Sequence, residues 1–110
     1  MEEHAWVKEF PVKIEICDRN GILIEMNDKA ITSEGDPDLI GSNILDCHPE
    51  PARSKLQDIL EHEKTNIYTI EKDGVKKLIY QAPWFLNGGF AGIVELSLEV
   101  PVEMPHFVRG

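Results

Sequence analysis

Two neighbouring residues, Cys47 and His48, are the side chains in this sequence that are best suited to chemistry. A thiolate beside an imidazole serves both nucleophilic catalysis and metal binding. The side chains of adjacent residues diverge, however, so one metal ion or one proton transfer is difficult to serve from both. The other potential zinc ligands, Cys17 and His62, stand at spacings that match no zinc motif. We therefore expect neither cysteine catalysis nor a structural zinc site.

The rest of the sequence offers no other enzyme signature. It lacks Gly-x-Gly-x-x-Gly, a phosphate-binding Gly-Lys-Ser, Gly-x-Ser-x-Gly and His-Glu-x-x-His. Its two cysteines form neither a disulfide framework nor a Cys-x-x-Cys pair, which is typical of a reducing compartment. We therefore expect a protein that is not an enzyme.

Length and composition limit the partners that this chain can have. Its 110 residues, 42% hydrophobic and 28% charged, suit one globular domain. Twenty acidic residues against eleven basic ones give a net charge of −9, which repels a polyanion such as nucleic acid. No apolar run approaches the roughly 18 residues of a membrane span, and the first residues lack a secretory signal. The sequence predicts a cytoplasmic protein with neither a nucleic-acid nor a membrane partner.

Two groups of strands are predicted to position any site. The alternation in residues 12–16 places Val12, Ile14 and Ile16 on one face of a strand and Cys17 on the other. A tight turn at Asn20-Gly21 leads into a second strand. The later strands, joined by turns at 73–74 and 87–89, are expected at 66–72, 75–82 and 90–100. Pro83 either ends regular pairing or marks an edge or a bulge.

The segment between the strand groups is predicted to be helical. Asn27 or Asp28 can cap a short helix that Gly35 ends. After Pro51, a substantial helix carries an apolar stripe that includes Leu56 and Ile59. An antiparallel sheet needs one face covered, and this helix is the apolar one available. The prediction is an α+β fold, in which short helices and one longer helix cover a face of a five-stranded antiparallel sheet.

This order of elements resembles a PAS domain over roughly residues 11–100. It runs through an Asp-Arg-Asn-Gly turn at 18–21, Asn-Asp-Lys-Ala-Ile at 27–31 and Gly-Ser-Asn-Ile-Leu-Asp-Cys-His-Pro at 41–49. Asp-Cys-His-Pro at 46–49, with Gly-Ile-Val-Glu at 92–95, is similar to the PAS modules attached to hemerythrin-like domains in bacteria and archaea. The resemblance implies a PAS-like five-stranded sheet at 11–100, an N-terminal extension at 1–10 and a C-terminal tail at 101–110.

The resemblance also implies a sensory module with a pocket between sheet and helices. With no effector domain in these 110 residues, such a module would act alone and signal through an effector protein. His48 precedes the helix that borders the pocket in this fold, and its imidazole could ligate haem iron or hydrogen-bond a bound acid. Alternatively, the imidazole binds a backbone carbonyl and fixes the turn before Pro49. The residues that we assign to the pocket are His48, Cys47, Leu56, Tyr80, Gln81 and Trp84.

Two classes of function remain open from the sequence. In one, the pocket binds a small molecule or a cofactor, of which haem is one candidate. In the other, the protein is a ligand-free interaction or dimerisation module, and its own side chains fill the core. Large apolar residues on the sheet favour the filled core, namely Ile14, Ile16, Met26, Tyr80, Leu96 and Leu98. We expect a homodimer in either class, because apolar residues near both chain ends leave surplus apolar surface: Trp6, Val7 and Phe10, and Val102, Met104, Phe107 and Val108.

Overall fold

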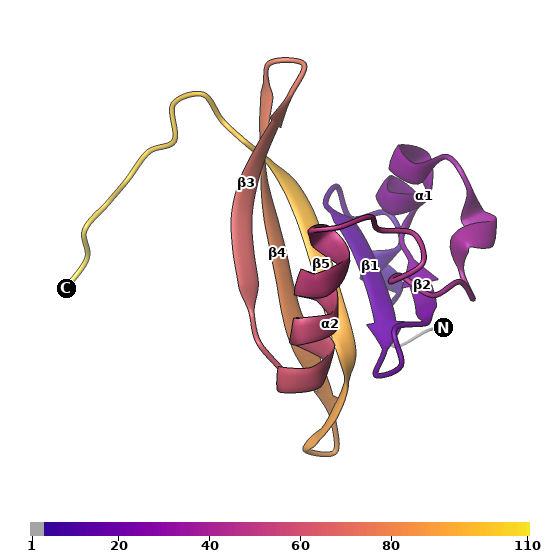
Figure 1. Cartoon of the computed structure of the whole chain (residues 1–110). Helices are drawn as coiled ribbons and strands as arrows, with labels where there is room; N and C mark the ends of the chain where they lie inside the picture. The colour runs from indigo at the N-terminus through magenta and orange to yellow at the C-terminus, as the bar shows by residue number, and fades with distance from the viewer. Residues whose placement is uncertain (1–3) are drawn as a thin grey trace.

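The structure, a computed structural model, describes residues 4–110, so residues 1–3 of the predicted N-terminal extension lie outside the described residues. One antiparallel sheet has the strand order β2-β1-β5-β4-β3 (Figure 1). The strands are β1 (Lys13–Asp18), β2 (Leu23–Met26), β3 (Asn66–Lys72), β4 (Val75–Leu86) and β5 (Gly89–Val100). The helices are α1 (Asp28–Glu34) and α2 (Ala52–His62), with 3₁₀ turns at Ala5–Val7 and Pro37–Leu39. The predicted α+β architecture is confirmed.

Asn27 explains how the first strands and α1 are held together. It caps α1, as predicted, and Gly35 ends that helix in a left-handed conformation. The Asn27 side chain is buried, so each of its polar atoms needs a partner. Its Oδ1 accepts from the backbone N–H groups of Ala30 and Ile14, and its Nδ2 donates to the carbonyls of Val7, Phe10 and Val12. One amide thus fixes the segment that precedes the sheet.

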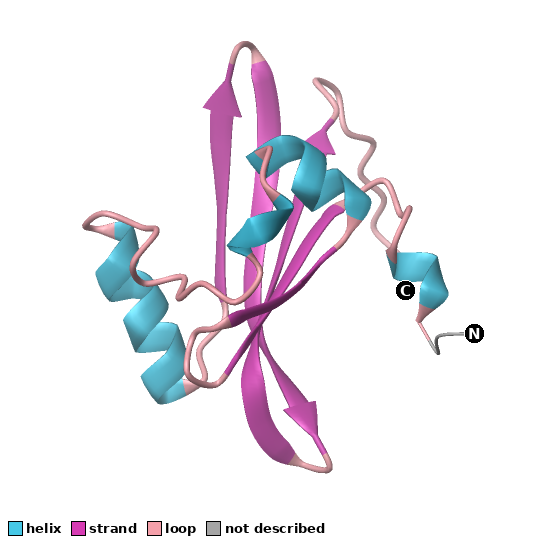
Figure 2. Ribbon diagram, turned by 90° about the vertical axis from the view of Figure 1, so that its right-hand side faces the viewer, coloured by secondary structure: helices cyan, strands magenta, loops and turns pink. Residues whose placement is uncertain are grey.

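Helix α2 covers one side of the sheet, and in Figure 2 the N-terminal turn lies on the other side. Its two buried residues, Leu56 and Ile59, belong to the predicted apolar stripe. They pack with Cys17 of β1 and Ile93 of β5. The predicted helix and its sheet-facing residues are confirmed.

The side of the sheet that the helices cover is the reverse of the one expected from apolarity. In the observed register, Glu15 lies opposite Glu95, and Glu95 lies opposite Gln81. This set lines the space beneath α2, and we call its side the inner face. The alternate set, which includes Ile16, Val94, Leu96 and Tyr80, belongs to the outer face. Of the large residues expected to fill the core between sheet and helices, only Met26, which lies opposite Glu15, is on the inner face.

Candidate functional site

A cavity with a volume of about 30 Å³ lies between α2 and the inner face. Two larger hollows, of about 190 Å³ and 200 Å³, lie beside it, and His48 lines all three. The residues around the small cavity come from β1, β2, β4, β5, α2 and the 41–48 segment: Glu15, Cys17, Leu23, Ile44, His48, Leu56, Gln81, Ile93 and Glu95. His48 therefore sits where three spaces meet.

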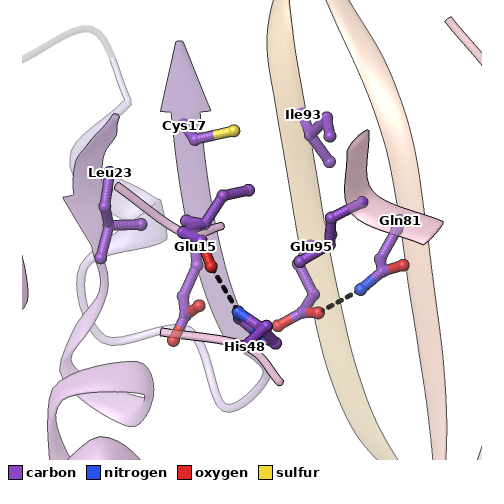
Figure 3. Close-up of a pocket in the computed structure, with 9 residues that line it drawn as sticks. Glu15, Cys17, Leu23, His48, Gln81, Ile93 and Glu95 are labelled. Carbon is purple, nitrogen blue, oxygen red and sulfur yellow. Dashed lines mark hydrogen bonds between the residues drawn. The ribbon is translucent and has the colours of Figure 1, made fainter. Parts of the chain in front are cut away.

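The cavity has a polar end and an apolar end. Figure 3 shows Glu15, His48 and Glu95 gathered at one end, and Cys17 and Ile93 at the other. Alternation along β1 and β5 creates this division, because residues two apart on a strand share a face. A bound molecule would meet charge at one end and hydrocarbon at the other.

The His48 imidazole is held in one orientation by the turn that precedes it. Its Nδ1 lies 2.7 Å from the carbonyl oxygen of Ile44. A carbonyl can only accept, so Nδ1 carries the hydrogen and donates it. In the neutral imidazole, Nε2 is then left with a lone pair, as an acceptor. The turn-fixing bond expected from the sequence is present, and the same residue lines the cavity.

A row of polar side chains crosses the inner face of three strands. Asn66 of β3 donates from Nδ2 to Oε1 of Gln81 over 3.1 Å, and Gln81 donates from Nε2 to Oε1 of Glu95 over 2.7 Å. These residues are direct register partners across β3, β4 and β5, and Glu15 of β1 continues the row. Gln81 is only 4% exposed, so both of its bonds are needed to keep it buried. The row fixes the Glu95 carboxylate at the polar end of the cavity.

One ammonium group accompanies the two carboxylates at the polar end. Lys13 Nζ lies 3.4 Å from Glu15 Oε1, and the two side chains are 18% and 16% exposed. Lys13, Glu15 and Glu95 all line the 200 Å³ hollow beside His48. With His48 neutral, these three groups carry a formal charge of −1.

Comparison with solved structures decides the fold family of this arrangement. The C-terminal domain of a Streptococcus mutans protein superposes with a TM-score of 0.72 and 19% identity, over 86% of this chain and 79% of that one. The PAS domain of BvgS from Bordetella pertussis gives a TM-score of 0.68 and 17% identity, over 87% of this chain and 82% of that one. This chain has the PAS fold. No family model and no curated protein matches the sequence.

A third structure with this fold is that of an oxygen sensor. The Aer2 receptor of Vibrio cholerae, described as a dual PAS-heme oxygen sensor, matches with a TM-score of 0.56 and 17% identity, over 82% of this chain and 95% of that one. At these identities the likeness concerns the fold. The similarity to PAS modules attached to hemerythrin-like domains remains a prediction.

The PAS sheet divides the residues that the sequence assigned to the pocket. His48, Leu56 and Gln81 line the small cavity, and Cys47 lines the adjoining 200 Å³ hollow. Tyr80 and Trp84 line none of these three spaces, because their alternation places them on the outer face. That part of the assignment is corrected.

Sequence reasoning missed Glu15, Glu95 and Asn66, the other members of the polar row. None of the three is among the residues that the sequence assigns to the pocket. One signal in the sequence could have indicated Glu95. It lies on the same face of its strand as Ile93, an apolar residue, so this face is not uniformly polar as a solvent-exposed face would be.

The two cysteines of this chain occupy contrasting environments. Burial, aided by the charges of Asp18 and Glu95, raises the pKa of Cys17 to about 11, so its thiol stays protonated near neutral pH. Such a thiol is a poor nucleophile. Cys47 is exposed, with its Sγ 3.9 Å from the Ser42 hydroxyl. Among residues 4–110, no group of three or more His, Cys, Asp or Glu side chains is placed to hold a metal ion.

Haem does not fit the residues around His48. Pockets for drug-sized ligands hold roughly 300–1,000 Å³, whereas the three spaces beside His48 measure about 30, 190 and 200 Å³. The imidazole also faces two carboxylates, which repel the propionates of the porphyrin.

Within residues 4–110, the helices are too short or too polar to cross a bilayer.

Proposed function

We propose that this PAS domain is a sensory module that binds a small molecule beside His48 and signals through a separate effector protein. The observation that carries the proposal is the polar row, which holds a carboxylate against a cavity under α2. Burying charge without compensation destabilises a fold, so a core with only a structural role favours apolar residues there. Neighbours described as sensor histidine kinases support a sensory role.

The test of this proposal compares two histidines. The protein purified from cells is examined by native mass spectrometry, and its ¹⁵N-labelled form is titrated with a small-molecule extract of the same cells. We expect an added mass, or shifts of amide signals around the cavity. His48→Ala should weaken this binding ten-fold or more, which is about 1.4 kcal/mol. His62→Ala is the matched control, because His62 is exposed on α2 and bonds to Asp58.

Two outcomes would contradict ligand sensing beside His48. In the first, His48→Ala leaves binding unchanged and lowers the free energy of unfolding by about 1 kcal/mol, as expected if the imidazole only braces the turn. In the second, no mass is retained and no component of the extract shifts a cavity residue. The second result favours the alternative, a ligand-free interaction module.

We also propose that two copies pair through the outer face. Eight residues of the outer face form a patch without charged side chains, although the chain carries a net charge of −9. It can therefore meet its own copy without bringing acidic side chains together, as a two-fold interface requires. Within it, Ile67 is 54% exposed and Tyr80 37% exposed. The patch consists of Ile16, Ile67, Leu78, Tyr80, Ala82, Val94, Leu96 and Leu98.

Light scattering tests this pairing. The wild-type protein should have twice the monomer mass of 12.5 kDa, and Tyr80→Lys should reduce it to the monomer mass. Gln57→Lys adds the same charge at an exposed position on α2, which covers the inner face, and should leave the dimer intact. A wild-type monomer at millimolar concentration, or an unchanged mass for Tyr80→Lys, contradicts pairing through this face.

A further inference from the structure

Apart from the Lys13 ammonium, which forms an ion pair with Glu15, the groups at the polar end of the cavity present acceptors to a ligand. An ionised carboxylate accepts hydrogen bonds and donates none. The His48 Nδ1 hydrogen is already given to Ile44, so Nε2 presents a lone pair. The Gln81 amide nitrogen donates to Glu95. A molecule that enters beside Glu95 and His48 therefore meets mainly acceptors and must bring most of the donors itself.

The net charge at the polar end favours a positively charged ligand. Glu15 and Glu95 contribute two negative charges, and Lys13 contributes one positive charge. The Glu95 carboxylate also acts on its neighbours, since it adds to the effect of burial in raising the pKa of Tyr68. A ligand with one positive charge would neutralise this end, whereas an anion would be repelled. The bound acid considered from the sequence is therefore disfavoured.

The rest of the cavity limits the body of the ligand. Leu56 and Ile93 line it with hydrocarbon beyond the polar end. Its volume of about 30 Å³, and the 200 Å³ hollow on the Lys13 side, suit a short chain rather than a ring system. Among residues 4–110 no cluster of three metal-ligating side chains is present, so a bare metal ion is the poorer match.

We infer that the ligand is a small organic ammonium ion, with its N–H groups bound by Glu15, Glu95 and His48 Nε2 and a short hydrocarbon body directed toward Leu56 and Ile93. This inference rests on the proposed ligand-binding function and specifies its chemistry. Each ammonium hydrogen would find one acceptor, and a charge-assisted hydrogen bond is about twice as strong as a neutral one. Specificity would come from the acceptors that a neutral or anionic analogue leaves unpaired.

The experiment uses three probes of similar shape: n-butylammonium, butan-1-ol and butyrate. Each is titrated into the ¹⁵N-labelled full chain up to about 10 mM, where binders with millimolar dissociation constants are visible. We expect n-butylammonium to shift amides beside the cavity and to bind at least ten-fold more tightly than the other two probes.

Three variants locate the binding. Glu95→Gln keeps an acceptor for Gln81 but removes the charge, and should weaken n-butylammonium binding ten-fold or more. Glu99→Gln, at an exposed position on the same strand, is the matched control and should bind as the wild type does. Lys13→Met should strengthen n-butylammonium binding several-fold, because the Lys13 ammonium no longer competes with the ligand for the Glu15 carboxylate.

The outcomes separate the ligand class from the site. Binding of butan-1-ol or butyrate in the cavity, as tight as that of n-butylammonium or tighter, overturns the ammonium inference and leaves ligand binding beside His48 in place. Equal binding of n-butylammonium to wild type and Glu95→Gln also overturns it. If no probe shifts a cavity amide, the ammonium inference fails, and the titration with cell extract then decides whether ligand binding fails with it.

Discussion

The two faces of the sheet differ in a way that contradicts the usual rule for a covered surface. Beneath α2, one row across the strands reads Asn66, Gln81, Glu95 and Glu15. One residue along, the row on the outer face reads Ile67, Tyr80, Leu96 and Ile14. The covered face thus holds carboxylates, while the less covered face holds apolar side chains. An arrangement that is costly for folding is one that function can explain.

The inner face itself has two parts with different roles. Cys17 and Ile93 pack with Leu56 and Ile59, and this cluster attaches α2 to the sheet. The polar row begins two residues further along β1 and β5, where Glu15 lies opposite Glu95. The apolar cluster stabilises the fold, whereas the polar row, by our proposal, recognises the ligand. The predictions below test this division.

The largest effect is expected at Gly92 of β5, which lies directly against the backbone of β1. A Cβ atom there would stand 1.9 Å from the carbonyl oxygen of Cys17, and φ is +148°. Since backbone on both strands must move, Gly92→Ala should lower the free energy of unfolding by at least about 4 kcal/mol. Gly88→Ala is the control for the steric contact, because its φ of +82° is also positive but its Cβ would meet no atom within 4 Å. Denaturant titrations in which both variants behave alike would show that the two strands can separate freely.

The next effect concerns the cluster that attaches α2. Leu56 and Ile59 are 5% and 2% exposed, so Leu56→Ala and Ile59→Ala should each cost about 2–5 kcal/mol, the range for truncating a buried aliphatic side chain. Leu86→Ala, at a position 64% exposed, should change stability far less. Midpoints of urea unfolding measure all three. Little change for both helix variants would mean that α2 contributes little to the core.

A smaller effect distinguishes recognition from stability within the polar row. Glu95→Leu alone should cost about 1–3 kcal/mol, because the buried Gln81 amide loses its acceptor. Replacing Gln81 by Leu as well removes both partners of this bond and should restore part of that loss, although the Asn66 amide then loses its acceptor. Thermal unfolding of the single and double variants forms the comparison. If the double variant is much less stable than the single one, the row supports the fold rather than a ligand.

The smallest effect appears only in alkali. The pKa of Cys17 is raised to about 11 in the folded protein from an ordinary value of 9.0, so the unfolded chain loses its thiol proton first. Stability from this group is complete below pH 9 and should fall by up to about 1.4 kcal/mol per pH unit between pH 9 and 11. Cys17→Ala should remove that part of the slope. An unchanged slope would show that the thiol ionises equally well in the folded protein.

Local signals made much of the fold predictable. Capping by Asn27 and the end of α1 at Gly35 depend on neighbours in the chain. Pro83 shows the limit of such signals. It lies within β4 rather than at its end, because β3 stops at Asn66, opposite Gln81. From there on β4 pairs with β5 alone, and its other edge is open where Pro83 has no N–H to offer.

The candidate site was only half predictable for a different reason. Alternation separates the residues of a strand into two sets but does not say which set the helices cover. Apolarity favoured the set with Leu96 and Tyr80, whereas α2 packs on the set with Cys17 and Ile93. His48 was identifiable because it precedes the long helix that, by the PAS resemblance, borders the pocket. The meeting of Glu15 with Glu95 depends on pairing between residues 80 positions apart, which no local pattern encodes.

The indole of Trp84 gives the cavity wall an optical reporter. Its Nε1 donates to the carbonyl oxygen of Cys17 over 3.0 Å, and thus connects the outer face to the strand that carries Glu15. The other tryptophan, Trp6, is 65% exposed at the chain's beginning. Replacing Trp6 by Phe therefore leaves a single tryptophan, which is bonded to the β1 backbone. Its emission wavelength would follow displacement of that strand directly, without any label on the protein.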